Sequence, residues 1–467
     1  MPPGASIADI LARLAALESD VVKQAKRIAQ LEAENAQLKI ENASLRHRLG
    51  QNSSNSSRPP SSDGPQVPKP NRSLRSRSGK SAGAQAGHPP ASLKFVDTPE
   101  AIIEHRPRAC AACGEGLAAR PDEGDPRANR HQIFDVPPIR VHVTEHRMLA
   151  RRCRCGHLTR ATKPAQLPSR CRTSYGEGIT ALVSYFSVRQ YLPIARLAEL
   201  ITDVLGTPIS SGTVAAMLNR SAAALCDTLT GIRERIAHSN VVGSDETPIR
   251  ENGRRLDAWV WHTDRVAYLA RGPGRGSAVH QREFPNGLPQ ATLVTDRLAA
   301  QLATVSKSKQ VCIPHLQRTV RGLSEADRAT WWCEEMAEVL SQINEAGAYG
   351  HRATDEQADQ IELAIDKVLS TMYDSEDVPE QEVSLRASLS QVRKALTRCL
   401  YDKDVPPDNN GSERLIRNLK VKLKISGQWR SEAGTKAYLA IRSVIETAIK
   451  QGLRPLDVLV DPGLLSL

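Results

Sequence analysis

A seven-residue repeat of apolar side chains in segment 7–49 restricts the fold of this chain more than any other feature of its sequence. One position of the repeat is occupied by Ile7, Leu14, Val21, Ile28, Asn35, Asn42 and Leu49, and the other by Ile10, Leu17, Gln24, Leu31, Leu38 and Leu45. β-branched residues at three of the seven first positions, mainly leucine at the second and asparagine within the seam favour a parallel two-stranded coiled coil. A helix packed on its own domain would need no asparagine there. We therefore predict that residues 1–50 form a helix that dimerises the protein.

Residues 51–92 lack the apolar side chains that a folded core requires. The stretch begins with QNSSNSSRPPSSD and is rich in serine, proline, glycine and basic residues, with Asp63 as its one acid. This composition predicts a disordered basic linker. Its cations can contact phosphates without sequence preference, and an inert spacer would have the same composition.

Residues 93–168 contain two close pairs of cysteines, and these predict a small zinc-binding module. The four cysteines, in RPRACAACGEGL and RRCRCGH, are Cys110, Cys113, Cys153 and Cys155. Four thiolates can hold a structural Zn²⁺ once a hairpin brings the pairs together, with His157 as a substitute ligand. Between the pairs, the residues around Val141 and Val143 alternate like a strand. Four free thiols are the alternative, but so small a module would then lack a stabiliser.

Residues 169–234 have the pattern of a helix, a glycine-containing turn and a second helix. The first helix is expected in YLPIARLAELITDVLG and the second in TPISSGTVAAMLNRSAAAL, capped by Ser210 or Ser211. A helix-turn-helix places its second helix in the major groove of DNA. The residues predicted to contact DNA there are Ser211, Thr213 and Arg220. A helical hairpin packed on a neighbouring domain has nearly the same pattern, so both interpretations stay open.

Residues 235–322 change to the periodicity of strands. VVGSDETPI predicts an apolar strand that ends in Asp245 and Glu246, and ATLVTDRLAAQL predicts another that ends in Asp296 before a helix. RRLDAWVWHTD and RVAYLAR predict a hairpin of two adjacent strands. Strands that carry carboxylates at their ends suit a binding site at the edge of a sheet.

Residues 323–402 have three apolar stripes at helical spacing and predict an inserted helical subdomain. Residues 403–467 predict the final helices, the first of them capped by Asp408 or Asn409. The chain is therefore expected to be a multidomain α/β protein with a mixed sheet and a helical insertion.

Glu413 is unusual because it lies in a strongly basic stretch, DNNGSERLIRNLKVKLK. The cations that follow it are Arg414, Arg417, Lys420, Lys422 and Lys424. Together with Asp245 and Asp296, this glutamate could hold two Mg²⁺ ions, with Mn²⁺ as a substitute, for phosphodiester chemistry. The alternative roles are strand-end capping for the two aspartates and an i,i+4 salt bridge from Glu413 to Arg417.

The overall charge and hydropathy favour some classes of protein and exclude others. A formal net charge of +11 suggests a polyanionic partner, with nucleic acid as the first candidate. The sequence has no apolar run of eighteen residues and no signal-peptide pattern, so a cytoplasmic location without a membrane partner is expected. Its nine cysteines are odd in number and unevenly spaced, which argues against a disulfide framework.

Four sequence blocks resemble those of the insertion-sequence-66 family of bacterial transposases. The blocks are SDETPI, TDRLAA, CIPHLQR and DNNGSERLIRNLKVKLKISGQWRS. The order of the zipper, the NSSRPPSSD linker, the cysteine module and the acid-bearing blocks also matches, so the resemblance covers nearly the whole chain. It implies an RNase H-like fold with a helical insertion, and it assigns the three catalytic acids to Asp245, Asp296 and Glu413.

The resemblance also implies a function on DNA. A transposase of this kind would bind the terminal inverted repeats of its element, cleave at their ends with Mg²⁺ and transfer the 3′-hydroxyl to target DNA. It would act as an oligomer in the bacterial nucleoid, together with accessory proteins of the same element. Asp296 is followed by Arg297 and Leu298, where the family commonly has glycine and tyrosine, and Cys312 by Ile313 instead of tryptophan. Neither change removes a metal ligand.

Further residues of the matching blocks have predicted roles beside the acids. His315 and Arg318 are expected on one helical face near the scissile phosphate, with Arg417 beside Glu413. Phosphates flanking the cut are expected at Lys420, Lys422 and Lys424. Ordinary packing and surface charge are the alternatives, and Cys312 with His315 could also bind a metal.

Two other functions share parts of this pattern. A catalytically silent DNA-binding regulator derived from a transposase would have lost one of the three acids, and all three are present. A nuclease or Holliday-junction resolvase on the same fold would share the acids. It would not need a zipper, a zinc module and a helix-turn-helix together.

Overall fold

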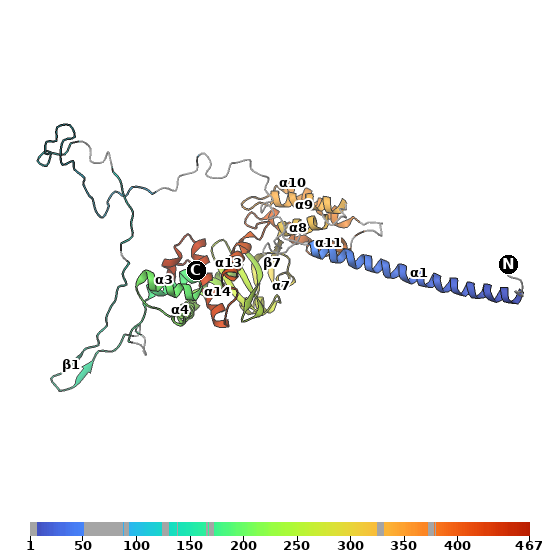
Figure 1. Ribbon diagram of the computed structural model, residues 1–467, viewed down its shortest axis with the longest axis horizontal. Helices are drawn as coiled ribbons and strands as arrows, with labels where there is room; N and C mark the ends of the chain where they lie inside the picture. Colours follow the sequence, from blue (N-terminus) through green and yellow to red (C-terminus); the bar gives the residue numbers. More distant parts are fainter. Residues whose placement is uncertain are drawn as a thin grey trace. The chain divides into compact units, whose positions relative to one another are not determined.

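A computed structural model describes residues 7–50, 87, 93–123, 130–137, 139–164, 167, 172–324, 331–371, 378 and 380–467 (Figure 1). Apart from Gly87, the predicted linker 51–92 lies outside these residues. The chain divides into one unit of residues 1–70, 148–201 and 208–467, and a second unit of residues 71–147 and 202–207. No helix of the described part is long and apolar enough to cross a membrane.

Helix α1 (Ile7–Gly50) runs through the whole heptad repeat, as the sequence predicts. Seam residues such as Leu17, Val21 and Leu38 are more than half exposed on this single chain. An apolar stripe of this kind needs a covering partner in water. Pairing of α1 with a second copy remains a prediction.

Within the second unit, the described residues of segment 71–147 form loops and turns, with an isolated β-bridge between Ala109 and Gly116. The amide of Gln132 exchanges two hydrogen bonds with the backbone of Val96, and Arg130 lies over the Phe95 ring at 5.2 Å. Alternation around Val141 and Val143 predicts a strand, but residues 139–149 contain none. That prediction is wrong because a strand needs a neighbour for its backbone hydrogen bonds, and Val143 is 83% exposed.

Five strands form a mixed sheet with the order β5-β4-β3-β6-β7. They are β3 (Val241–Glu251), β4 (Arg254–His262), β5 (Ala267–Gly272), β6 (Leu288–Thr295) and β7 (Ser306–Val311). The pairs β3–β4 and β4–β5 are antiparallel, whereas β3–β6 and β6–β7 are parallel. The predicted α/β class and the predicted hairpin of β4 and β5 are confirmed.

Strand β3 is longer than the sequence analysis predicts, since it continues beyond Asp245 and Glu246 to Glu251. It turns into β4 through Asn252 and Gly253, whose φ angles are +46° and +76°. Asn-Gly is the preferred pair for a two-residue hairpin turn because both positions require a positive φ. The acids therefore lie within a paired strand and not at its end.

The sheet and the helices around it share one hydrophobic core. These helices are α2 (Glu177–Val188), α4 (Ser211–Ala224), α5 (Cys226–Ala237), α6 (Ala278–Glu283), α13 (Asn410–Ser426), α14 (Glu432–Lys450) and α15 (Pro455–Val460), and α3 (Ile194–Leu205) lies between α2 and α4 in the sequence. Trp259 and Trp261 are fully buried and stack with ring centroids 6.1 Å apart. Strand β5 would be an open edge, but Ser443 and Thr447 of α14 accept hydrogen bonds from its backbone N–H groups.

A second hydrophobic core lies in the helical insertion. Here α9 (Trp331–Ala346), α10 (Asp355–Ser370) and α11 (Glu380–Gln391) gather beside α8 (Ile313–Ser324) (Figure 1). The short helix α7 (Ala299–Leu302) precedes β7 in the sequence, whereas the short helix α12 (Arg398–Tyr401) comes much later in the chain and packs against β7. Residues predicted as apolar stripes, among them Met336, Leu340 and Ile365, are buried.

Arg442 of α14 is fully buried and joins three parts of the first core. Its Nη1 donates to the carbonyl of Val188 at the end of α2, and its Nη2 pairs with Glu446. The guanidinium also lies 5.6 Å from the ring centroid of Tyr191. This cation links the α2–α3 region to the helices that follow the sheet.

Arg442→Met should lower the free energy of unfolding by about 3–5 kcal/mol, because it leaves a buried carboxylate without its main partner. Arg454→Met is the matched control, since Arg454 forms an exposed ion pair with Asp457 and should change stability by about 0.5 kcal/mol or less. Urea unfolding of both variants measures the difference. Equal effects would show that the buried cation has no special role.

Candidate active site

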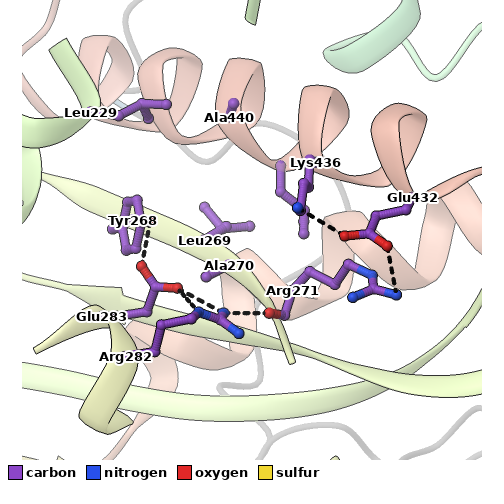
Figure 2. A pocket seen from close by; sticks show the side chains of 11 residues that line it. Leu229, Tyr268, Leu269, Ala270, Arg271, Arg282, Glu283, Glu432, Lys436 and Ala440 are labelled. Carbon is purple, nitrogen blue, oxygen red and sulfur yellow. Dashed lines mark hydrogen bonds and ion pairs between the residues drawn. The ribbon is translucent and has the colours of Figure 1, made fainter. Parts of the chain in front are cut away.

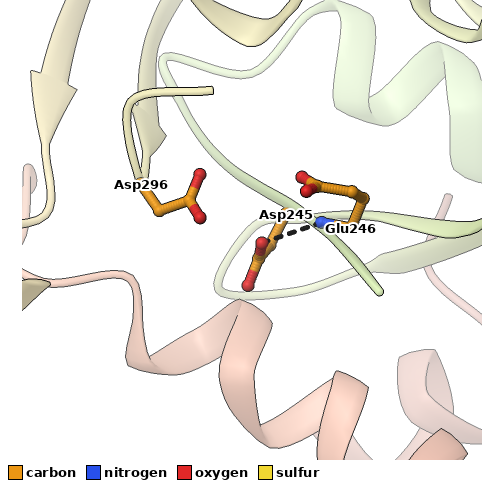
Figure 3. Close-up of side chains that lie close together, drawn as sticks. All are labelled: Asp245, Glu246 and Asp296. Carbon is orange, nitrogen blue, oxygen red and sulfur yellow. Dashed lines mark hydrogen bonds between the residues drawn. The ribbon is translucent and has the colours of Figure 1, made fainter. Parts of the chain in front are cut away.

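The end of β6 leaves one edge of β3 unpaired where Asp245 lies. Pairing between β3 and β6 covers Val241 to Gly243, and β6 ends at Thr295. Asp296 follows at once and points across to β3, so that ligand oxygens of Asp245, Glu246 and Asp296 all lie within 4.8 Å of one another (Figure 3). The Glu246 N–H donates to Oδ1 of Asp245 at 2.8 Å. Three acids therefore meet at this edge.

These acids are buried and repel one another. Burial, followed by the charges of Asp296 and Glu246, raises the pKa of Asp245 well above its ordinary value. Burial also raises the pKa of Asp296, whose Oδ1 has no hydrogen-bond partner among the described residues. Crowded carboxylates with an unpartnered oxygen are suited to a divalent cation, which favours their charged form.

Glu413 is placed near this group by the first turn of α13. Its charge also raises the pKa of Asp245, although it lies outside the closest group of three. Its Oε1 lies 3.6 Å from both His315 Nε2 and Arg318 Nη2 of α8. These contacts place His315 and Arg318 on the helical face that the sequence predicts. The alternative bridge from Glu413 to Arg417 is not formed, and Arg417 is exposed.

Cys312, directly before α8, contacts both His315 of α8 and Asn409 at the start of α13. Nδ1 of His315 lies 3.1 Å from Sγ of Cys312, and the Asn409 N–H donates to the same sulfur at 3.3 Å. Burial raises the pKa of the Cys312 thiol to about 12 and lowers the pKa of His315 to about 3. The bond from Asn409 to the Cys312 sulfur holds the start of α13 against the start of α8.

The start of α13 is docked on β3 by two further contacts. The side chain of Asn409, predicted as a helix cap, makes no capping bond and instead donates to the carbonyl of Ser244 at 2.9 Å. The ring of His262 fits between two glycines. A Cβ on Gly243 would lie 2.3 Å from Nε2 of this ring, and a Cβ on Gly411 would lie 2.2 Å from its Cε1.

Residues 172–437 match the family model described as Transposase IS66 family, which is more than half of the chain. The chain belongs to the IS66 family of transposases. Residues 6–94 also match a family of unknown function, DUF6444. One relative is an uncharacterized protein, y4qI, from Sinorhizobium fredii (strain NBRC 101917 / NGR234), 27% identical over 429 residues that cover 83% of this chain and 74% of the relative. The family implies DNA as the class of substrate.

In this IS66-family chain the three lysines of α13 predicted to contact phosphates differ from one another in their surroundings. Nζ of Lys420 donates to the carbonyl of Pro248 at 3.3 Å, and burial lowers its pKa. Lys422 points inward, with its Nζ 5.8 Å from the ring centroid of Tyr438, and burial lowers its pKa as well. Lys424 is exposed. A phosphate contact from Lys422 stays a prediction, as do those from Lys420 and Lys424.

The predicted helix-turn-helix contains both helices, α3 and α4. Ser210 is the cap of α4, since its Oγ accepts from the Thr213 N–H. The hydroxyl of Thr213 is also engaged with Ser210, at 2.9 Å. Ser211 and Arg220 are exposed. Base contacts by α4 remain a prediction.

Each cysteine pair forms a tight turn of its own. The Gly114 N–H donates to the carbonyl of Cys110, and the Gly156 N–H donates to that of Cys153. Backbone N–H groups within each turn lower the pKa of the Cys110 and Cys153 thiols. Thiolate-stabilising turns are suited to zinc ligands. Because Cys110 and Cys153 belong to separate units, their convergence on one ion remains a prediction.

Three residues near the acids have no role in the sequence analysis. Arg275 and Gln301 both bind Glu246, and neither lies in a strong motif. Arg297 has a φ of +78°, and its buried Nη1 lacks a hydrogen-bond partner in the described part of the chain. The glycines around Arg275, in GPGRGS, were the one local signal of a functional loop.

A hollow of about 330 Å³ beside β5 and α14 lies apart from the acid group (Figure 2). Its charged side chains pair with one another. Arg282 pairs with Glu283, and Glu432 pairs with both Arg271 and Lys436. With these charges compensated, the hollow offers no open group for chemistry, in contrast to the acids at β3.

Gly411→Ala should lower the free energy of unfolding by about 1–3 kcal/mol, because the added Cβ would overlap the His262 ring. Gly212→Ala in α4 is the control. Its Cβ would meet only Ser210 Oγ at 3.8 Å, and alanine favours a helix by up to about 1 kcal/mol. Thermal unfolding compares the two. A stabilised Gly411→Ala protein would contradict the packing described here.

Low pH should destabilise the protein partly through His262, because burial lowers the pKa of this histidine to about 3. Below about pH 6.5 the unfolded chain binds a proton that the folded chain does not, so stability is lost as pH falls toward 3. In His262→Gln the slope of unfolding free energy against pH should flatten by about 1.4 kcal/mol per pH unit in this window. Exposed His351 supplies the control, His351→Gln, whose slope should equal that of wild type.

Proposed function

We propose that this IS66-family protein is a DNA transposase that binds the terminal inverted repeats of its element, cleaves a strand at their ends and transfers the 3′-hydroxyl to target DNA. The observation that carries the proposal is the meeting of acids from separate elements at the open edge of β3. Asp245 comes from β3, Asp296 follows β6, and Glu413 begins α13. The family match over residues 172–437 supports the same function.

The order of the strands supports an RNase H-like fold for the catalytic core. Three antiparallel strands are followed by two that run parallel to the first, in the order β5-β4-β3-β6-β7. Helices α9 to α12 lie between β7 and α13 in the sequence, as the resemblance to these transposases implies for a helical insertion.

The donor set fits Mg²⁺, with Mn²⁺ as a substitute. Asp245, Asp296 and Glu413 offer carboxylate oxygens, and one oxygen of Asp296 has no other partner in the described residues. Two such ions, when bound, supply activation of the attacking oxygen and stabilisation of the leaving one. Arg318 and neutral His315 hold the Glu413 carboxylate toward the group.

Cations near the acids suit the flanking phosphates. Lys420 lies close enough to Asp245 and Arg255 for their charges to shift its pKa. Arg250 and Arg255 are exposed and directly paired across β3 and β4, and Lys424 is exposed on the same helix as Lys420. DNA leaving the acids would pass over these side chains.

The remaining parts of the chain would arrange the two ends of the element. The exposed seam of α1 suits pairing with a second copy, which brings two catalytic cores together. Helix α4 and a Zn²⁺ held by the four cysteines would contribute to end recognition. Accessory proteins of the same element would complete the assembly.

Strand cleavage of a donor DNA carrying the element's ends, with Mg²⁺, tests the function. Asp245→Asn, Asp296→Asn and Glu413→Gln should each lower the rate more than about 100-fold, because even partners one shell removed from a metal cost about 10–100-fold. Asp264→Asn, which changes an exposed acid in the turn after β4, should cleave like wild type. If Asp245→Asn or Glu413→Gln still cleaves the donor DNA, the assignment of these acids as catalytic residues is wrong.

The zinc proposal has a separate test in metal analysis of the purified protein. Wild type should contain about one Zn²⁺ per chain, and Cys110→Ser and Cys153→Ser should each lose most of it, since four ligands close a structural site. Cys226→Ser changes an exposed cysteine in α5 and should keep the metal. Unchanged zinc in either of the first two variants would rule out this ligand set.

A further inference from the structure

Glu246 differs from the two acids beside it because both of its carboxylate oxygens are already hydrogen-bonded. Oε1 accepts from Nε of Arg275 at 2.7 Å and also from Nη2 of the same guanidinium. Oε2 accepts from Nε2 of Gln301 at 3.1 Å. The side chain of Glu246 is only 2% exposed, so water does not compete for these bonds. In contrast, Oδ1 of Asp296 is buried and has no such partner among the described side chains.

A cation on Glu246 would have to share the carboxylate with the Arg275 guanidinium. Arginine stays charged under all ordinary conditions, so a divalent ion on the same carboxylate would be repelled at close range. Asp245 and Asp296 carry no such guanidinium bond. The three acids within 4.8 Å of one another therefore divide into two ligands and one anchor.

One side of the Arg275 guanidinium is bound to buried Glu246, and the other side is exposed to solvent. It lies in the loop between β5 and α6, where the carbonyl of Gly274 accepts from Nε1 of buried Trp259 at 3.1 Å. Its side chain remains 55% exposed although its partner is buried. Arg275 also lies close enough to Asp296 for each charge to shift the pKa of the other.

A guanidinium in this position has the properties of a phosphate ligand. Two of its nitrogens are bound to Glu246, and Nη1 makes no hydrogen bond within the described chain. The Glu246 carboxylate already holds the Arg275 guanidinium in one orientation, so the arginine side chain loses little further entropy when an anion binds. The anion that must reach this acid group in a DNA-cleaving protein is a backbone phosphate.

We propose that Arg275 binds a DNA phosphate at the acid group and that Glu246 is a positioning residue for this arginine and not a metal ligand. The inference rests on the proposed function for the identity of the anion. Gln301 completes the arrangement by holding the second oxygen of Glu246. A purely structural ion pair would have the same contacts, so the test must measure more than stability.

Binding of Mn²⁺ to the full-length protein separates the roles of the acids. Titration calorimetry should show less than a tenfold loss of Mn²⁺ affinity in Glu246→Gln, an equal or higher affinity in Arg275→Ala because a nearby positive charge is removed, and at least a tenfold loss in Asp245→Asn and Asp296→Asn. If Glu246→Gln loses Mn²⁺ as Asp245→Asn does, Glu246 is a ligand and the proposal fails. This measurement needs no DNA cleavage, so it stays informative even if the proposed function is wrong.

Binding to donor DNA without divalent metal tests the phosphate contact. The slope of log affinity against log salt concentration should become shallower by about 0.9 in Arg275→Ala, as expected for one lost phosphate contact. Arg275→Lys should keep the slope because it keeps the charge. Arg282→Ala, which removes another half-exposed, ion-paired arginine, should also keep it. An unchanged slope in Arg275→Ala would reduce the pair to a structural role and overturn the proposal.

Cleavage kinetics test whether Glu246 acts through Arg275. Glu246→Gln should raise KM for donor DNA with a smaller change in kcat, and Arg275→Ala should do the same. The double variant should be no worse than Arg275→Ala, because the anchor has no function without its arginine. Multiplicative losses in the double variant would show that Glu246 has an independent role and would contradict the proposal.

Discussion

The docking of α13 on β3 is the contact on which the candidate site depends. Asn409 binds the backbone of Ser244, and the His262 ring fills the space left by Gly243 and Gly411. Because these glycines lack a Cβ, the helix approaches the strand closely enough to bring Glu413 toward Asp245. Without this contact the third acid would lie on a separate helix with no defined relation to the first two.

Charge is distributed around this contact in a way that keeps the acids available. Burial and the charges of Asp296 and Glu246 raise the pKa of Asp245, and a divalent cation would relieve the repulsion among these carboxylates. Arg275 compensates Glu246, while Arg318 and His315 face Glu413. Arg275 and Arg318 thus each hold an acid at the edge of the group. Asp296, with its unpartnered oxygen, remains open toward a ligand.

Local periodicity explains which predictions from the sequence are confirmed. The heptad helix, the hairpin of β4 and β5 and the apolar stripes of the insertion depend on neighbours in sequence, and all are present. The strand predicted around Val143 is absent because it has no pairing partner. Lys422 lies in the predicted helix, but the packing of α13 turns it toward Tyr438. Whether a strand forms and which way a side chain points therefore depend on tertiary neighbours as well as on the local sequence.

The sequence by itself determined the family, most of the helices and strands and the choice of the three predicted catalytic acids, because motifs and periodicities are written in adjacent residues. Tertiary structure alone decided that Glu246 joins Asp245 and Asp296, and that Arg275 and Gln301 bind it from 29 and 55 residues away. The physical reason is the strand order. It places the end of β6, the loop after β5 and the start of α7 around one edge of β3, and no local pattern records that meeting.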